Sequence, residues 1–172
     1  MITPIEKIKD FLALTHDISI GYEQIHFFPA HELVEEQTGY SIAPNGKSLI
    51  TGQPGDWQRG WVAIGNDQLG DPIIADVNTP QLPIFSASFD MGQWSPIEIA
   101  DSLDNFKAIL SVMKKVSKGR THPANLEKNP ISDKLRIEVL TQIEQQNPGA
   151  ELWFWESYFR NIEEKEIAVV KH

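Results

Sequence analysis

The chain of 172 residues contains no cysteine. This absence excludes disulfide bonds, thiolate zinc sites and a cysteine nucleophile, and it fits the reducing conditions of the cytoplasm. No window approaches the roughly 20 apolar residues that a membrane-spanning helix needs. The first ten residues lack the basic stretch and apolar core of a secretory signal. We therefore expect a cytoplasmic protein with no membrane partner.

The motifs of common catalytic and cofactor-binding sites are missing as well. There is no G-x-S-x-G elbow of a hydrolase serine, no phosphate-binding glycine loop with its lysine, and no dinucleotide fingerprint. His26 and His31 are separated by Pro29, so they do not share a helical face as a metal-binding pair would. We expect no catalytic residues, no cofactor and no metal. An enzyme that uses His26, His31 and Glu32 with a carboxylate from the turn at Asp71 is kept as a third hypothesis.

Basic residues are scarce. Fifteen Lys and Arg stand against 24 Asp and Glu, which gives a net charge of -9. The phosphate backbone would repel such a surface on average, so we expect no nucleic-acid partner. An acidic surface suits a basic protein partner, because it steers the encounter. The same charge also serves solubility alone, and both interpretations stay open.

Apolar residues suffice for one core, since 41% of the chain is hydrophobic and 172 residues suit one domain. Apolar spacing of 3.6 residues and capping residues together predict four helices. They run from the cap at Thr3 to near His16, from the cap at Ser102 to the stop at Gly119, from the cap at Ser132 to residues 147–149, and over 152–159.

Short runs of β-forming residues predict strands at 24–28, 61–64, 72–77, 82–86 and 93–97. Their short connections favour antiparallel neighbours. Pro96 marks its strand as an edge or a strand end. Residues 32–38 fit helix and strand equally, residues 120–130 are predicted as loop, and 167–170 as an edge strand or a loose end. Helices beside an antiparallel sheet make an α+β fold.

One ordered series of motifs lies between residues 55 and 110. It reads GDWQRGWVAIGNDQLGDPIIADV, then PIFSASFDMGQWSPIEIADSLDNFKAIL. A tryptophan leads into a strand that ends at Ile64 and Gly65, an acidic turn with Gly-Asp-Pro follows, the next strand closes on Asp76, and a helix begins Ser102-x-x-x-Phe106. This series resembles the SUKH superfamily of bacterial toxin-immunity proteins and fungal SMI/KNR cell-wall regulators. The resemblance implies one domain over 1–172, a mixed and largely antiparallel sheet flanked by helices, and no catalytic residues.

Bacterial members of this superfamily are thought to protect a cell by binding a cognate toxin. The resemblance thus implies an intracellular immunity protein that neutralises a protein toxin. The alternative is a non-enzymatic scaffold or regulator of the SMI/KNR type that binds a cellular protein. The oligomeric state is left open. Charge and expected exposure select six candidate partner contacts, which are Asp67, Asp71, Asp76, Asp90, Trp94 and Glu98.

Some of these residues have a competing structural interpretation. A carboxylate at Asp71, in the turn before Pro72, can also bond nearby backbone amides. Tryptophans with a polar rim often anchor protein interfaces, but they are more often core. We predict that Trp61, Trp153 and Trp155 lie in the core. For Trp57 and Trp94 both roles stay open.

Overall fold

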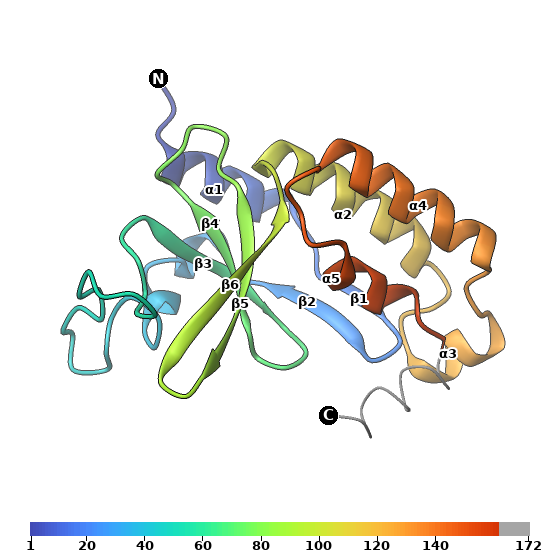
Figure 1. Ribbon diagram of the computed structural model, residues 1–172, viewed down its shortest axis with the longest axis horizontal. Helices are drawn as coiled ribbons and strands as arrows, with labels where there is room; N and C mark the ends of the chain where they lie inside the picture. The colour runs from blue at the N-terminus through green and yellow to red at the C-terminus, as the bar shows by residue number, and fades with distance from the viewer. Residues whose placement is uncertain (162–172) are drawn as a thin grey trace.

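Six strands form one antiparallel sheet in which each strand lies beside its neighbours in sequence. They are β1 (Ile18–Ile20), β2 (Glu23–Phe27), β3 (Trp61–Asp67), β4 (Pro72–Asp76), β5 (Ile84–Asp90) and β6 (Gln93–Ala100). Figure 1 shows this computed structural model, which describes residues 1–161. The predicted α+β fold, with helices flanking a largely antiparallel sheet, is confirmed. The apolar patch at 167–170 lies outside the described residues.

Three of the helices in residues 1–161, α1, α2 and α4, begin at the predicted caps. They are α1 (Pro4–Leu14), α2 (Leu103–Ser117), α3 (Pro123–Lys128), α4 (Asp133–Gln146) and α5 (Leu152–Glu156), with short 3-10 turns η1 (Ala30–Glu32), η2 (Glu35–Gln37) and η3 (Ser157–Phe159). At the start of α1 the Glu6 amide donates to Thr3 Oγ1 at 3.1 Å, and the Thr3 amide donates to Glu6 Oε2 at 2.8 Å. This reciprocal pair is the predicted capping box.

The helix α3 is a correction, because residues 120–130 were predicted as loop. Pro123 occupies its first turn, and no side chain caps it. Six residues are too few to show an apolar period. Burial of Leu126 in the core accounts for this helix, since tertiary packing can stabilise a segment whose local signals are weak.

The main core lies between one face of the sheet and the helices α1, α2, α4 and α5. We call this side of the sheet the helix face. Ile64, Ile73 and Ile99 point into it from three strands. Trp155 packs there too, and its Nε1 donates to the Ile99 carbonyl at 2.8 Å. Complete burial of such side chains contributes about 1.5–3 kcal/mol each.

The opposite face of the sheet is covered by side chains from residues 28–60, which we call the cover segment, although Ala30 and Leu33 within it pack against the main core. A second, smaller core forms between them from Phe28, Trp57, Ala63, Ile74 and Ala87. In Figure 1 this segment lies at the left, away from α2 and α4. We call this side the cover face, and β4 is buried because both of its faces are packed.

The strand β6 forms one edge of the sheet, as Pro96 within it predicted. Two segments bond to its free side. The Trp94 amide donates to the Gly55 carbonyl at 2.7 Å, and the Glu151 amide donates to the Glu98 carbonyl at 2.8 Å. These bonds protect an edge that would otherwise pair with other chains.

Candidate partner-binding surface

The six predicted contact residues fall into different parts of the structure. One is buried, one lies in the β3–β4 turn, one lies at the tip of the β5–β6 hairpin, and the others lie along the cover face. In this order they are Asp67, Asp71, Asp90, and then Asp76, Trp94 and Glu98. They therefore do not form one continuous patch.

Asp67 holds the β3–β4 turn together. Its Oδ1 accepts the amides of Leu69 at 2.9 Å and Asp71 at 3.0 Å. Its cross-strand partner is Ile25, whose side chain belongs to the main core, so Asp67 faces inward and is only 8% exposed. The exposure expected of Asp67 was wrong for this reason. The bonding of backbone amides considered for Asp71 is performed by Asp67.

Burial also governs the charge of this turn. Burial raises the pKa of Asp67 to about 6, the neighbouring Asp71 carboxylate adds to the rise, and the two backbone hydrogen bonds oppose it. Burial likewise raises the pKa of Asp71. The carboxyl group of Asp67 thus titrates within this turn, and its hydrogen bonds hold the backbone of the turn.

Asp76 and Glu98 lie toward the other end of the sheet. Asp76 pairs across strands with Trp61, and its Oδ1 accepts the Asn78 amide at 2.9 Å. Glu98 is half-buried, and burial and the nearby Asp101 raise its pKa. Both carboxylates are available only in part to a partner.

Five aromatic side chains gather where the cover segment meets the β5–β6 hairpin. We call them the aromatic cluster: Tyr40, Trp57, Trp61, Phe89 and Trp94. Trp57 is its buried centre, 1% exposed, and its ring lies 5.5 Å from Trp61, 5.4 Å from Trp94 and 5.2 Å from Tyr40. Its Nε1 donates to the Trp61 carbonyl at 3.0 Å. Phe89 packs on Trp94 with ring centroids 4.8 Å apart, so the exposed Phe89 ring and the half-buried Trp94 ring lie above the buried Trp57.

Two large apolar side chains at the tip of the β5–β6 hairpin are exposed to solvent. Phe89 is 58% exposed and Met91 is 94% exposed. The turn residues Met91 and Gly92 have φ of 52° and 77°, the signature of a type I′ turn. Asn and Gly are favoured at its first central position, and a left-handed residue with a side chain costs roughly 1–2 kcal/mol. Met91 therefore costs free energy in two ways, because its backbone is left-handed and its apolar side chain is exposed to water.

The hairpin is nevertheless firmly seated. The bond from the Trp94 amide to the Gly55 carbonyl ties β6, next to the turn, to the cover segment. Gly55 has φ of 86°, and a Cβ there would lie 2.8 Å from the Gln93 side chain, so only glycine fits this contact. We call the exposed residues Phe89, Asp90 and Met91, together with the half-buried Trp94, the hairpin patch.

The predictions made for the tryptophans have different outcomes. Trp155 lies in the core as predicted, and Trp61 packs half-buried against the smaller core. Trp153 is exposed, so its predicted core position was wrong; it lies on the outer side of the short helix α5. Trp57 is core, and Trp94 is half-buried within the patch.

Three residues of the enzyme hypothesis, His26, His31 and Glu32, are exposed. His26 Nδ1 lies 2.9 Å from Asp17 Oδ2, and His31 Nε2 lies 3.6 Å from Glu32 Oε1. In residues 1–161, no three or more His, Asp or Glu side chains gather in a way that could hold a metal ion. None of the helices in the described part of the chain is long and apolar enough to cross a membrane.

Comparison of the chain with protein-family models, curated proteins and solved structures found no match. The resemblance to the SUKH superfamily therefore stays a prediction that depends on the ordered motifs of residues 55–110.

Proposed function

We propose that this protein acts by binding another protein through the hairpin patch, as an intracellular, non-enzymatic immunity protein that neutralises a cognate toxin. The observation that carries the proposal is Met91, an almost fully exposed side chain on a left-handed backbone. Unfavourable features of this kind concentrate at functional sites. A partner that covers Met91 and Phe89 would give these side chains the burial that the free protein lacks.

The construction of the patch suits an interface. Energetic hot spots of interfaces are aromatic side chains in well-packed positions, surrounded by contacts that exclude water. Trp94 packs on buried Trp57, and Phe89 packs in turn on Trp94, so both rings lose little conformational freedom on binding. Patches of exposed apolar side chains with a polar rim mark protein contacts.

Charge narrows the class of partner. The chain carries a net charge of -9, and Asp90 is exposed at the tip of the patch. A toxin that acts on nucleic acid needs a basic surface to contact phosphates. An acidic protein can approach such a surface quickly and cover it, because opposite charges accelerate association.

Co-expression with the protein encoded beside this gene tests the role in cells. If the neighbour is a toxin, cells that carry both genes grow, and cells that carry the toxin alone do not. With the double variant Phe89→Ser/Met91→Asn, we expect protection to be lost although the protein remains folded.

The matched control is Ile137→Ser on α4, which removes a side chain that is 58% exposed, as Phe89 is, on the helix layer. We expect it to protect like the wild type. Protection by the double variant would refute the proposal that the hairpin patch binds the toxin. A neighbour that is not toxic, together with capture of a cellular protein by the same patch, would favour the scaffold alternative.

A further inference from the structure

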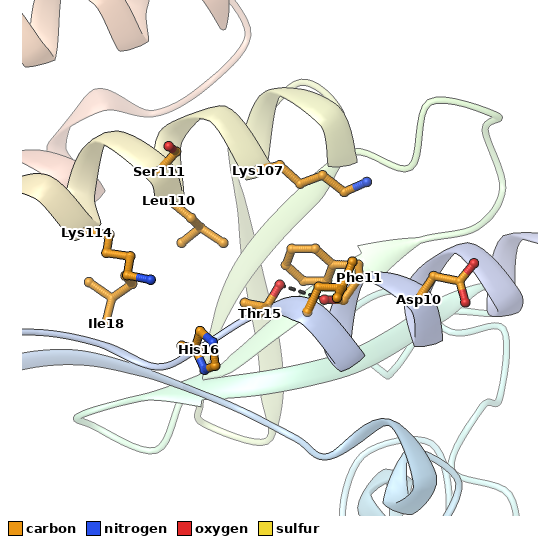
Figure 2. A pocket seen from close by; sticks show the side chains of 10 residues that line it. Asp10, Phe11, Thr15, His16, Ile18, Lys107, Leu110, Ser111 and Lys114 are labelled. Carbon is orange, nitrogen blue, oxygen red and sulfur yellow. Dashed lines mark hydrogen bonds between the residues drawn. The ribbon is translucent and has the colours of Figure 1, made fainter.

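A groove with a volume of about 390 Å³ lies between the last turns of α1 and one side of α2. Figure 2 shows its lining residues, with Leu110 and Phe11 directed between the two helices. Phe11, Ile18 and Leu110 are largely buried and form an apolar floor. Leu14 also lines the groove and is 83% exposed. The volume falls within the range of about 300–1,000 Å³ for small-molecule sites.

The two lysines of the groove are unequally paired. Lys107 lies 3.7 Å from Asp104, and Figure 2 shows it at the end of the groove near Asp10. At the other end Lys114 extends over Ile18, on the side of His16. Among residues 1–161, Lys114 makes no ion pair. One end of the groove therefore offers a free ammonium group in a protein that is acidic overall.

The end of α1 lies beside this groove, and the negative end of a helix dipole repels anions. Thr15 weakens this effect. Its Oγ1 donates to the Phe11 carbonyl at 2.6 Å, and its amide donates to the Leu12 carbonyl at 3.4 Å. Two of the carbonyls at the end of the helix are thus already bonded.

We infer that the groove binds a small amphipathic carboxylate of the medium-chain fatty-acid class. The alkyl tail lies on Phe11, Leu14 and Leu110, and the carboxylate pairs with Lys114. Covering Leu14 removes an exposed apolar side chain from water. Two lysines, Lys107 and Lys114, line the groove against one carboxylate, Asp10, at the end away from Lys114. This balance of charge favours an anion at Lys114 over a neutral or cationic ligand with the same tail. This site is separate from the hairpin patch and does not depend on it.

Titration of the protein with octanoate, 1-octanol and octylamine, followed by NMR shifts and calorimetry, tests the inference. We expect saturable octanoate binding with a dissociation constant below about 1 mM. Octanol should bind about fivefold more weakly or worse, since it lacks the charge, and octylamine should not saturate.

Variants locate the site. Lys114→Met keeps the apolar stem and should weaken octanoate about fivefold while leaving octanol unchanged. Lys115→Met, on the same helix outside the groove, is the matched control and should bind like the wild type. Ser111→Trp fills the groove and should abolish binding of both ligands. No saturation by octanoate, equal affinity for octanol, or an unchanged Lys114→Met variant would overturn the inference.

Discussion

Replacing Asp67 with asparagine should stabilise the protein at neutral pH. The Oδ1 of Asp67 alone accepts the amides of Leu69 and Asp71, and an asparagine carbonyl oxygen can accept both. The substitution therefore keeps the turn and removes the buried charge. What changes is the free energy of holding an ionised carboxylate in a site that favours its protonated form.

The magnitude follows from proton linkage. The pKa of Asp67 is about 6 in the folded protein and 3.8 for the ordinary group, so the native state holds the proton more tightly. The stability contributed by this proton is present below about pH 4 and is lost as the pH rises through about 6. The cost to the native state is about 1 kcal/mol at about pH 4.5 and about 3 kcal/mol at about pH 7.5.

Urea unfolding across this pH range measures the effect. The stability of Asp67→Asn minus that of the wild type should grow by about 2 kcal/mol between about pH 4.5 and about pH 7.5. Asp90→Asn removes the same charge from the exposed hairpin tip and controls for the general loss of negative charge. A difference for Asp67→Asn that does not change with pH, or that shrinks as the pH rises, would refute the raised pKa.

Two further predictions concern the hairpin and its base. Met91→Asn places a residue suited to a type I′ turn at φ 52°. The free energy of unfolding, measured by urea titration, should therefore rise by about 1 kcal/mol. A loss of stability would show that Met91 makes a stabilising contact in the free protein. Trp57→Ala removes the buried centre of the aromatic cluster and should destabilise the protein by about 3–5 kcal/mol in the same assay. A cost below about 1 kcal/mol would contradict the rigid base that we describe for Phe89 and Trp94.

Local signals explain why much of the fold could be predicted. The caps at Thr3, Ser102 and Ser132 act within one helical turn, so they are legible in the sequence, and all three are confirmed. The strands of the hairpins were found as apolar runs joined by short turns. The strand β1 was missed, because three residues are too few to show alternation.

Burial of single polar residues was less predictable. The inward direction of Asp67 depends on its register with Ile25 and on the irregular register of β3 between Ala63 and Gly65. A shift of one residue moves a side chain to the other face of a sheet. Such a shift arises from pairing between distant segments, and the residues around Asp67 do not show it.

The hairpin patch was found in part. Asp90 and Trp94 were selected by charge and by aromatic character. Phe89 and Met91 fall in the connection between the predicted strands 82–86 and 93–97, whereas β5 continues to Asp90 and the turn needs only two central residues. The signal that would have found them is Met-Gly in the place of Asn-Gly at a tight hairpin.

The affinity of the purified protein for the toxin that we propose as its partner tests the central proposal most directly. Calorimetry with the wild type, with Phe89→Ser/Met91→Asn and with Ile137→Ser gives three dissociation constants. We expect the double variant to bind at least about 30-fold more weakly, since loss of a hot spot costs about 2 kcal/mol or more. The Ile137→Ser protein should match the wild type. Equal affinities for all three proteins would contradict a binding site at the tip of the β5–β6 hairpin.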